Sequence, residues 1–187
     1  MIADDPGLAE FNKLPADQAE RELRTCCASA AWTAAIVAGR PYPDRDALFA
    51  TADEALADLD WAGVREALDA HPRIGERAAG GGREAAWSRG EQSGMDAATA
   101  EVRADLVAAN RAYEERFGHV FLIFATGRTD TDMLAAARER LGNSEEKEHD
   151  VVRRELGRIV ALRLTKLVNA TEPTGTTESA GTTEAST

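Results

Sequence analysis

The strand-like stretch of residues 119–125 (HVFLIFA) limits the possible fold classes of this chain more than any other sequence feature. It is apolar, carries β-branched and aromatic residues and lies between Gly118 and Gly127, a pattern typical of a buried strand or a buried helical segment. No other stretch has the pattern of a strand that could pair with it. A sheet is therefore not expected, and an extended 119–125 must find hydrogen-bond partners outside a ladder, a polar ligand among them.

Elsewhere, apolar residues recur at helical spacing between short loops that carry glycine, proline and capping residues. This pattern predicts an all-α, single-domain bundle of about seven to nine helices with one short extended segment near 119–125. Helices are expected over residues 15–26, over 29–38, through Leu59 after a cap at Asp44 or Asp46, over 61–70 after Asp60, over 96–117 from Asp96, through Leu141 after a start at Asp130 or Thr131, and over 145–168 after a cap at Asn143 or Ser144.

The chain divides into a helical domain, residues 1–169, and an acidic tail, residues 170–187. The tail is rich in Thr, Ser, Glu and Gly, has no large apolar residue and is expected to be disordered. The formal net charge is −11, of which three tail glutamates contribute −3 and leave −8 for the domain. An acidic surface disfavours nucleic acid and anionic membranes as partners, because binding phosphate needs basic residues.

The cysteines and the longest apolar stretch predict a cytoplasmic protein. Cys26 and Cys27 are adjacent in a helical pattern, which is poor geometry for a disulfide and offers too few ligands for a metal. Both are expected to be small buried residues in a reducing compartment. The stretch 28–39 is shorter than the about 20 residues that span a bilayer. The first ten residues lack the basic start and apolar run of a signal peptide.

His71 is the first candidate for chemistry. Because Pro72 disfavours the α conformation in the residue before it, His71 is expected just past a helix end, with its ring presented from a turn. A histidine in that place can give or take a proton near neutral pH. The alternative is a histidine that only complements the helix macrodipole.

A polar cluster follows the glycine run after His71. Ser88 and Glu91 have the spacing of a capping box, in which a hydroxyl and a carboxylate satisfy N–H groups at a helix start. A capped helix start also gathers N–H donors and a carboxylate at one point. The segment from Ser88 to Gln92 is therefore a candidate both for a structural cap and for a binding site.

Arg163 lies in the middle of an apolar arc on the last helix. A buried guanidinium must be paired, and its planar fork suits a carboxylate or a ring carbonyl. The alternatives to a ligand are an internal salt bridge or a side chain that reaches out to solvent. The arc is formed by Val152, Leu156, Ile159, Val160 and Leu167.

His119, His149 and Glu91 are the remaining candidates for a metal site. No pair among the histidines has the close spacing of HxxxH or HExxH. No metal site is expected, and both histidines are interpreted as structural.

Several stretches follow one another in a specific order along most of the chain. HPRIG is followed by SxxEQ and then by N-x-x-Y-x-x-x-F-G-x-x-F. In this combination the chain resembles the family of 2-oxo-4-hydroxy-4-carboxy-5-ureidoimidazoline (OHCU) decarboxylases, which act in the ureide pathway from urate to allantoin. The stretches that carry the resemblance are FNKLP, CCASAAW, RPYP, AHPRIG, SRGEQSGMD, NRAYEERFGHVFLIFATGR, RERLGN and LRLTKL.

The resemblance implies an all-helical homodimer that uses neither a metal nor an organic cofactor. It implies that His71 is the catalytic histidine, that Glu91 is its catalytic partner and that Arg163 binds the substrate. The stretch 121–125 is expected to meet the substrate through its backbone. The other substrate-binding residues that the matching motifs imply are Pro72, Ser88, Arg89, Gly90, Gln92, Phe121, Leu122, Ile123, Phe124 and Ala125.

The implied reaction is the cofactor-independent decarboxylation of OHCU to (S)-allantoin, with these small molecules as the binding partners. Arg163 and Gln92 would hold the ring and ureido oxygens, Glu91 would bind the 4-hydroxyl or ureido N–H groups, and His71 would donate a proton. The alternative is a non-catalytic helical binding module associated with purine-degradation enzymes. The combination of all four residues favours the enzyme, because a scaffold has no need of a proton donor together with a buried arginine.

Overall fold

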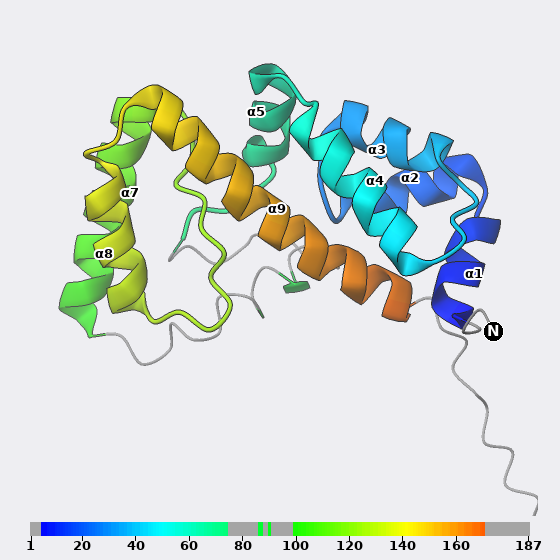
Figure 1. Ribbon diagram of the computed structural model, residues 1–187. Helices are drawn as coiled ribbons and strands as arrows, with labels where there is room; N and C mark the ends of the chain where they lie inside the picture. The colour runs from blue at the N-terminus through cyan, green and yellow to red at the C-terminus, as the bar shows by residue number, and fades with distance from the viewer. Residues whose placement is uncertain (1–4, 75–85, 88–89, 91–98, 171–187) are drawn as a thin grey trace, which may run out of the picture.

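The computed structural model describes residues 5–74, 86–87, 90 and 99–170, and this part of the chain is all-α, as predicted (Figure 1). It contains eight helices and no strand, within the predicted range of seven to nine. Their bounds are α1 (Pro6–Lys13), α2 (Ala16–Arg24), α3 (Ala30–Ala38), α4 (Arg45–Ala57), α5 (Trp61–Asp69), α7 (Ala100–Phe117), α8 (Asp130–Arg140) and α9 (Glu145–Ala170).

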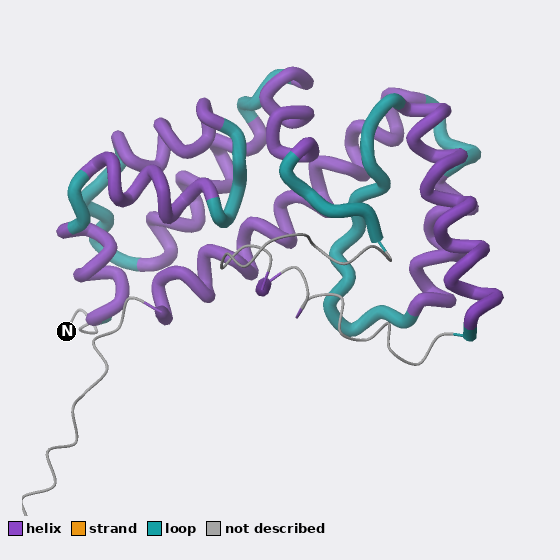
Figure 2. The backbone as a smooth tube through the Cα atoms, turned by 180° about the vertical axis from the view of Figure 1, so that it is seen from behind, coloured by secondary structure: helices purple, strands orange, loops and turns teal. Residues whose placement is uncertain are grey.

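The long helix α9 connects two groups of helices (Figure 1). The helices α1 to α4 gather around its C-terminal half, and both α1 and α4 pack directly against it. At its N-terminal end α7 and α8 pack against each other, while α5 lies over the middle of the molecule and contacts α3. Figure 2 shows that the extended segment after α7 runs beside the loop that follows α5. No described helix is long and apolar enough to cross a membrane.

Hydrogen bonds confirm the predicted helix caps at Asp44 and Asp60 and show one further cap, Ser29, at the start of α3. Ser29, Asp44 and Asp60 each accept from the backbone N–H three residues later, at 3.4, 2.8 and 2.8 Å respectively. Each of these oxygens satisfies one of the N–H groups that a helix start leaves without a partner. The cap at Asp60 is the one that matters most for the site, because His71 directly follows the C-cap of α5.

Of two other helix starts, one was predicted at the wrong residue and one is confirmed. The expected start at Asp96 is wrong because the hydroxyl oxygen of Thr99 caps α7, which begins at Ala100. The start of α8 at Asp130, one of the two predicted residues, is confirmed, and Thr129 is its N-cap. There Thr129 and Asp132 form a capping box in which each side chain satisfies the other's backbone N–H.

One helix that was not predicted and two helix ends also differ from expectation. The short helix α1 was not predicted, although Asp5 caps it and Pro6 occupies its first turn. The helix α2 ends earlier than expected, so Cys26 and Cys27 lie in the turn after it; both are buried. The last helix runs through Ala170, one residue beyond the predicted domain boundary.

The extended segment lies between two apolar cores. One core is shared by α1 to α5 and α9, and the other by α7, α8 and Ile74. Side chains alternate between them, which is the period of two that extended backbone produces. The prediction of an extended segment is thus confirmed. The residues facing the first core are Val120, Leu122 and Phe124, and those facing the second are Phe121, Ile123 and Ala125.

The change from helix to extended backbone occurs at Gly118. Its φ of +71° lies in the left-handed region, where a side chain would be strained, and its N–H closes the last turn of α7 on the carbonyl of Glu114 at 2.8 Å. Glycine therefore allows the chain to leave α7 and run between the two cores.

Candidate active site

His71 lies one residue past the C-cap of α5, as Pro72 predicts. Its backbone N–H donates to the carbonyl of Leu68 at 2.8 Å, and its ring Nδ1 lies 2.9 Å from the carbonyl oxygen of Ala67. Because a carbonyl oxygen can only accept, this contact assigns a hydrogen to Nδ1. The other ring nitrogen, Nε2, is then the one that gains and loses the exchangeable proton.

The stretch after His71 is attached to α7 by two contacts. Arg73 forms a two-bond ion pair with Glu114, at 2.6 and 2.9 Å. The side-chain amide of Asn110, which is buried, donates to the carbonyl of Ile74 at 2.7 Å. These contacts fix the chain on the far side of Pro72, so both ends of the short stretch that presents His71 are held.

The extended segment obtains hydrogen-bond partners from side chains instead of a neighbouring strand. Arg140 of α8 donates to the carbonyl of Leu122 at 2.7 Å, and the N–H of Phe124 donates to a carboxylate oxygen of Glu155 on α9 at 2.7 Å. Between them, neither backbone group of Ile123 has a hydrogen-bond partner in the described part of the chain. The expectation that this backbone needs outside partners is met in part by these two side chains.

Arg163 is buried in α9, with 2% of its surface exposed. This excludes the alternative of a side chain that reaches out to solvent. Its Nη1 lies 3.4 Å from the carbonyl of Thr25, in the turn after α2. The neighbouring Cys27 is also enclosed there, and burial raises the pKa of its thiol to about 11, so it is a protonated thiol at neutral pH.

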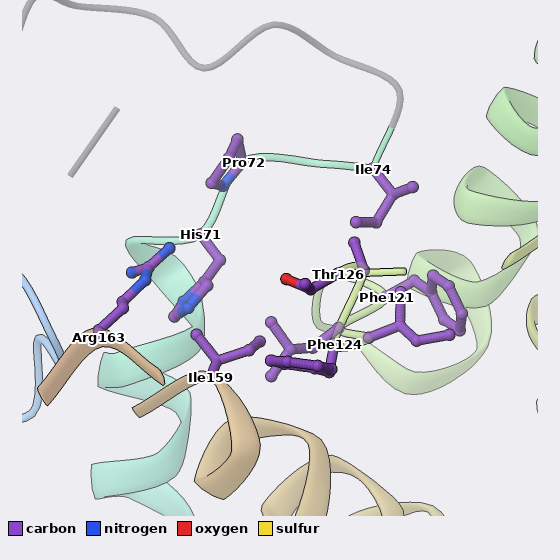
Figure 3. A pocket seen from close by; sticks show the side chains of 11 residues that line it. His71, Pro72, Ile74, Phe121, Phe124, Thr126, Ile159 and Arg163 are labelled. Atoms are coloured by element: carbon purple, nitrogen blue, oxygen red, sulfur yellow. The ribbon is translucent and has the colours of Figure 1, made fainter. Parts of the chain in front are cut away.

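One pocket brings these parts together (Figure 3). His71 and Pro72 reach it from the end of α5, the extended segment forms the opposite wall, and Arg163 approaches from α9. The predicted residues His71, Pro72, 121–125 and Arg163 therefore share one cavity. Sequence reasoning missed three other lining residues: Ile74, Thr126 and Ile159.

The missed residues carried weak but readable signals. Thr126 directly continues the apolar run, and Ile159 lies one helical turn before Arg163 on the same face of α9. Ile74 belongs to the HPRIG motif itself. None of the three has a side chain that would be singled out as reactive.

The remaining predicted site residues lie in the polar segment after the glycine run. Ser88, Arg89, Glu91 and Gln92 lie outside the described residues. Gly90 is helical and exposed, and the residues that line the pocket do not include it. The roles of these five residues stay predictions.

A buried ionic cluster next to the pocket was not predicted. The carboxylate of Glu148, which is fully buried, accepts from the guanidinium of Arg140 at 2.6 and 2.8 Å, from the amide of Asn143 at 2.7 Å and from the hydroxyl of Tyr113. Burial, and then the bond to the Glu148 carboxylate, raises the pKa of Tyr113 well above its usual value. The cluster connects α7, α8 and α9 to the carbonyl of Leu122.

Both remaining histidines pack among aromatic rings. His149 stacks on Trp61 with ring centroids 3.5 Å apart, and His119 meets the edges of Trp61 and Tyr113, each at 5.4 Å. Neither lines the pocket. The described residues contain no group of three potential ligands that could hold a metal ion.

His119 should make the fold sensitive to acid. Burial lowers the pKa of its imidazole below the ordinary 6.5, against a weaker opposite effect of its contact with the Val120 carbonyl. The charged and titratable groups around it are Arg140, Glu148 and His149. With the folded-state pKa lowered, its contribution to stability is complete above about 6.5 and is lost as pH falls through the folded-state value.

The measurement is the free energy of unfolding in urea between pH 7.5 and 5. Wild-type protein should lose more stability over this interval than His119→Phe, with about 1.4 kcal/mol for each unit by which the pKa is lowered. The phenyl ring fits the aromatic surroundings but does not titrate. Equal losses in the two proteins would show that other groups cause the acid sensitivity.

A small pocket that joins a histidine, an unsatisfied backbone and a buried arginine within a helical domain defines the class of this protein as an all-α enzyme for small molecules. The family model of OHCU decarboxylase matches residues 12–165. The chain belongs to the OHCU decarboxylase family.

Curated relatives agree with this assignment. A 2-oxo-4-hydroxy-4-carboxy-5-ureidoimidazoline decarboxylase of Amia calva is 33% identical over 137 residues, which cover 72% of this chain and 78% of the relative. The uric acid degradation bifunctional protein TTL of Arabidopsis thaliana is 31% identical over 151 residues, or 79% of this chain. The match spans about half, 47%, of the length of the Arabidopsis protein.

Two solved structures share the fold. A crystal structure of OHCU decarboxylase in the presence of (S)-allantoin matches with a TM-score of 0.69 and 29% identity, over 79% of this chain and 97% of the other. A crystal structure of (S)-allantoin synthase matches with a TM-score of 0.66 and 18% identity, over 86% of this chain and 53% of the other, and at that identity supports the fold alone.

Proposed function

We propose that this chain catalyses the cofactor-independent decarboxylation of OHCU to (S)-allantoin in urate degradation. The observation that carries the proposal is the convergence of His71, the backbone of 121–125 and Arg163 on one pocket. The similar crystal structure of OHCU decarboxylase in the presence of (S)-allantoin supports the same ligand chemistry.

The substrate itself provides the place for the electrons of the broken bond. When the bond between the ring carbon and its carboxylate breaks, CO2 leaves and the electron pair moves towards the adjoining C=N unit of the ring. A proton is then added to the ureido-bearing carbon, and the 4-hydroxyl becomes the ring carbonyl as its proton passes to the ring nitrogen, which completes allantoin. The protein therefore has to orient the ring and deliver one proton.

His71 is the proposed proton donor. Its Nδ1 is occupied by the carbonyl of Ala67, so the proton that moves is the one on Nε2. Delivery from one side wall of the pocket would place the proton on one face of the ureido-bearing carbon. This accounts for a single enantiomer as product.

The backbone around Ile123 is the proposed partner of the ligand's polar groups. Its N–H and C=O have no partner in the described part of the chain, and Ile123 lines the pocket. A ureido group and an imidazolone ring offer both N–H donors and carbonyl acceptors, so one ligand can satisfy both backbone groups. Glu91 as catalytic partner, and Ser88, Arg89, Gly90 and Gln92 as ligand contacts, complete the proposed site.

Arg163 is proposed to bind ring or ureido oxygens, and this gives a quantitative prediction. In Arg163→Lys, kcat/KM should fall by roughly 10- to 100-fold, because a hydrogen bond to a charged group is worth about 1.5–3 kcal/mol and lysine lacks the planar fork. Steady-state kinetics and the affinity for (S)-allantoin measure the loss. The matched control is Arg154→Lys, at an exposed position of the same helix. If the affinity of Arg163→Lys for (S)-allantoin is unchanged, Arg163 does not bind the ligand.

The proposal as a whole is tested with the wild-type chain and freshly prepared OHCU. CO2 release and the optical rotation of the product should both show formation of (S)-allantoin. Product formed without an enzyme has no preferred face and is racemic, so optical activity separates catalysis from spontaneous decay. A protein that binds allantoin but forms no optically active product would support a non-catalytic module instead.

We also propose that the protein is a cytoplasmic homodimer, as the resemblance to the family implies. Light scattering coupled to size-exclusion chromatography should then give about twice the chain mass of 20.0 kDa. A mass equal to one chain at micromolar concentration would contradict the dimer.

A further inference from the structure

Phe124, in the middle of the pocket wall, is held by two residues of α9. Its backbone N–H donates to Glu155 Oε2 at 2.7 Å, and the guanidinium of Arg158 lies over its ring, 4.5 Å from the centroid. The two holding residues also approach each other, with Arg158 Nη1 3.5 Å from Glu155 Oε1. Phe124 is thus fixed through both its backbone and its side chain.

Glu155 belongs to the same face of α9 as two residues that line the pocket. Ile159 and Arg163 follow it at successive turns, and both contribute to the cavity wall (Figure 3). A helix rises about 1.5 Å per residue, so the Cα atoms of Glu155 and Arg163 are roughly 12 Å apart along a rigid rod. The hydrogen bond from Phe124 therefore attaches the pocket backbone to the helix that carries Arg163.

The segment is held at a second point on the other side of Ile123. Arg140 of α8 binds the carbonyl of Leu122, while Glu155 of α9 binds the N–H of Phe124. Ile123 lies between these two contacts, and its own N–H and C=O stay unpaired in the described part of the chain. The two side chains take the places of neighbouring strands on either side of Ile123 and leave the backbone of Ile123 for a ligand.

We propose that Glu155 is a positioning residue for the reaction, which holds Phe124 so that the backbone of Ile123 and the head of Arg163 meet the same ligand molecule. This inference rests on the proposed function, because it assigns the ligand's contacts within that pocket. A carboxylate suits the role, because it is an acceptor only and its bonds to N–H donors are stronger than neutral ones. The residue does not touch the reacting atoms itself.

The test compares Glu155→Ala with Glu155→Gln. The alanine variant loses the acceptor, whereas glutamine keeps an oxygen in reach of the Phe124 N–H and loses only the charge. We expect kcat/KM for OHCU to fall about tenfold or more in Glu155→Ala and to stay within about threefold of wild type in Glu155→Gln. Glu146→Ala, at an exposed glutamate of the same helix, is the matched control and should keep full activity.

Two readouts separate positioning from simple loss of stability. Rates are measured well below the melting temperature of each variant and per folded protein, so a role confined to stability would leave kcat/KM unchanged. Hydrogen exchange of the Phe124 amide should accelerate in Glu155→Ala and remain slow in Glu155→Gln. Unchanged kcat/KM in the folded alanine variant, or equal losses in both variants, would overturn the inference.

The exchange measurement also keeps this inference distinct from the proposed function. If wild-type protein forms no (S)-allantoin, the proposed function fails, and the inference fails with it. If wild type is active and the Phe124 amide exchanges equally fast in all four proteins, the decarboxylase stands and the role of Glu155 is refuted.

Discussion

His71→Asn is expected to lower kcat for OHCU decarboxylation by about 10²- to 10⁴-fold, the range typical for removal of a general acid. Asparagine can place its amide nitrogen near the position of Nδ1 and keep the hydrogen bond to the carbonyl of Ala67. It offers no group that titrates near neutral pH. Because the contact with α5 is retained, KM should change much less than kcat.

The optical purity of the product is a second readout for this variant. If His71 delivers the proton from one wall of the pocket, the residual allantoin formed by His71→Asn should be close to racemic. His149→Asn is the matched control, because His149 is half-buried against Trp61 and lies outside the pocket. A folded His71→Asn protein that gives optically pure (S)-allantoin at near wild-type rate would refute the assignment.

Local signals in the sequence predicted most of the helices. A cap such as Asp60 acts on an N–H three residues away, so its effect can be read from neighbouring letters alone. The same holds for Gly118, which ends α7 in the left-handed conformation. The helix α1 was missed because its eight residues give too short an apolar repeat, although Asp5 and Pro6 marked its start.

The convergence at the pocket was predicted by resemblance and not by pattern. His71 follows α5 and Arg163 lies on α9, and no spacing rule connects residues so far apart in the chain. What the pattern did indicate was an anomaly at each place: a histidine before a proline, an arginine in an apolar arc and a strand without a partner. The structure explains these anomalies together, because all three features line one cavity.

Arg140 binds the extended segment, and its own partner, Glu148, could not be predicted from the sequence. Glu148 lies in the first turn of α9, where an acidic residue is expected to favour the helix macrodipole. Glu145 and Glu146 are exposed and fit that interpretation, but Glu148 is fully buried and binds Arg140. All three residues are glutamates, and only the packing of α7 and α8 decides which of them faces inward.

The buried pair Arg140–Glu148 leads to the largest expected change in stability. Arg140→Met removes one partner and leaves the Glu148 carboxylate enclosed without its cation, which should cost about 3–5 kcal/mol of unfolding free energy. For a chain of this size that corresponds to a fall in melting temperature of roughly 6–20 °C. Urea unfolding at pH 7 and thermal melting measure the two quantities.

A double variant shows whether the loss comes from an unpaired charge. In Arg140→Met combined with Glu148→Leu, neither charge of the pair remains, so a large part of the lost stability should return, even though Tyr113 and Asn143 lose an acceptor. The surface pair Arg21–Asp17, whose side chains are 67% and 70% exposed, supplies the control, since Arg21→Met should cost no more than about 1 kcal/mol. Equal costs at the two arginines would contradict this account. Because Arg140 also binds the carbonyl of Leu122, the double variant should regain stability without regaining activity, which separates its two roles.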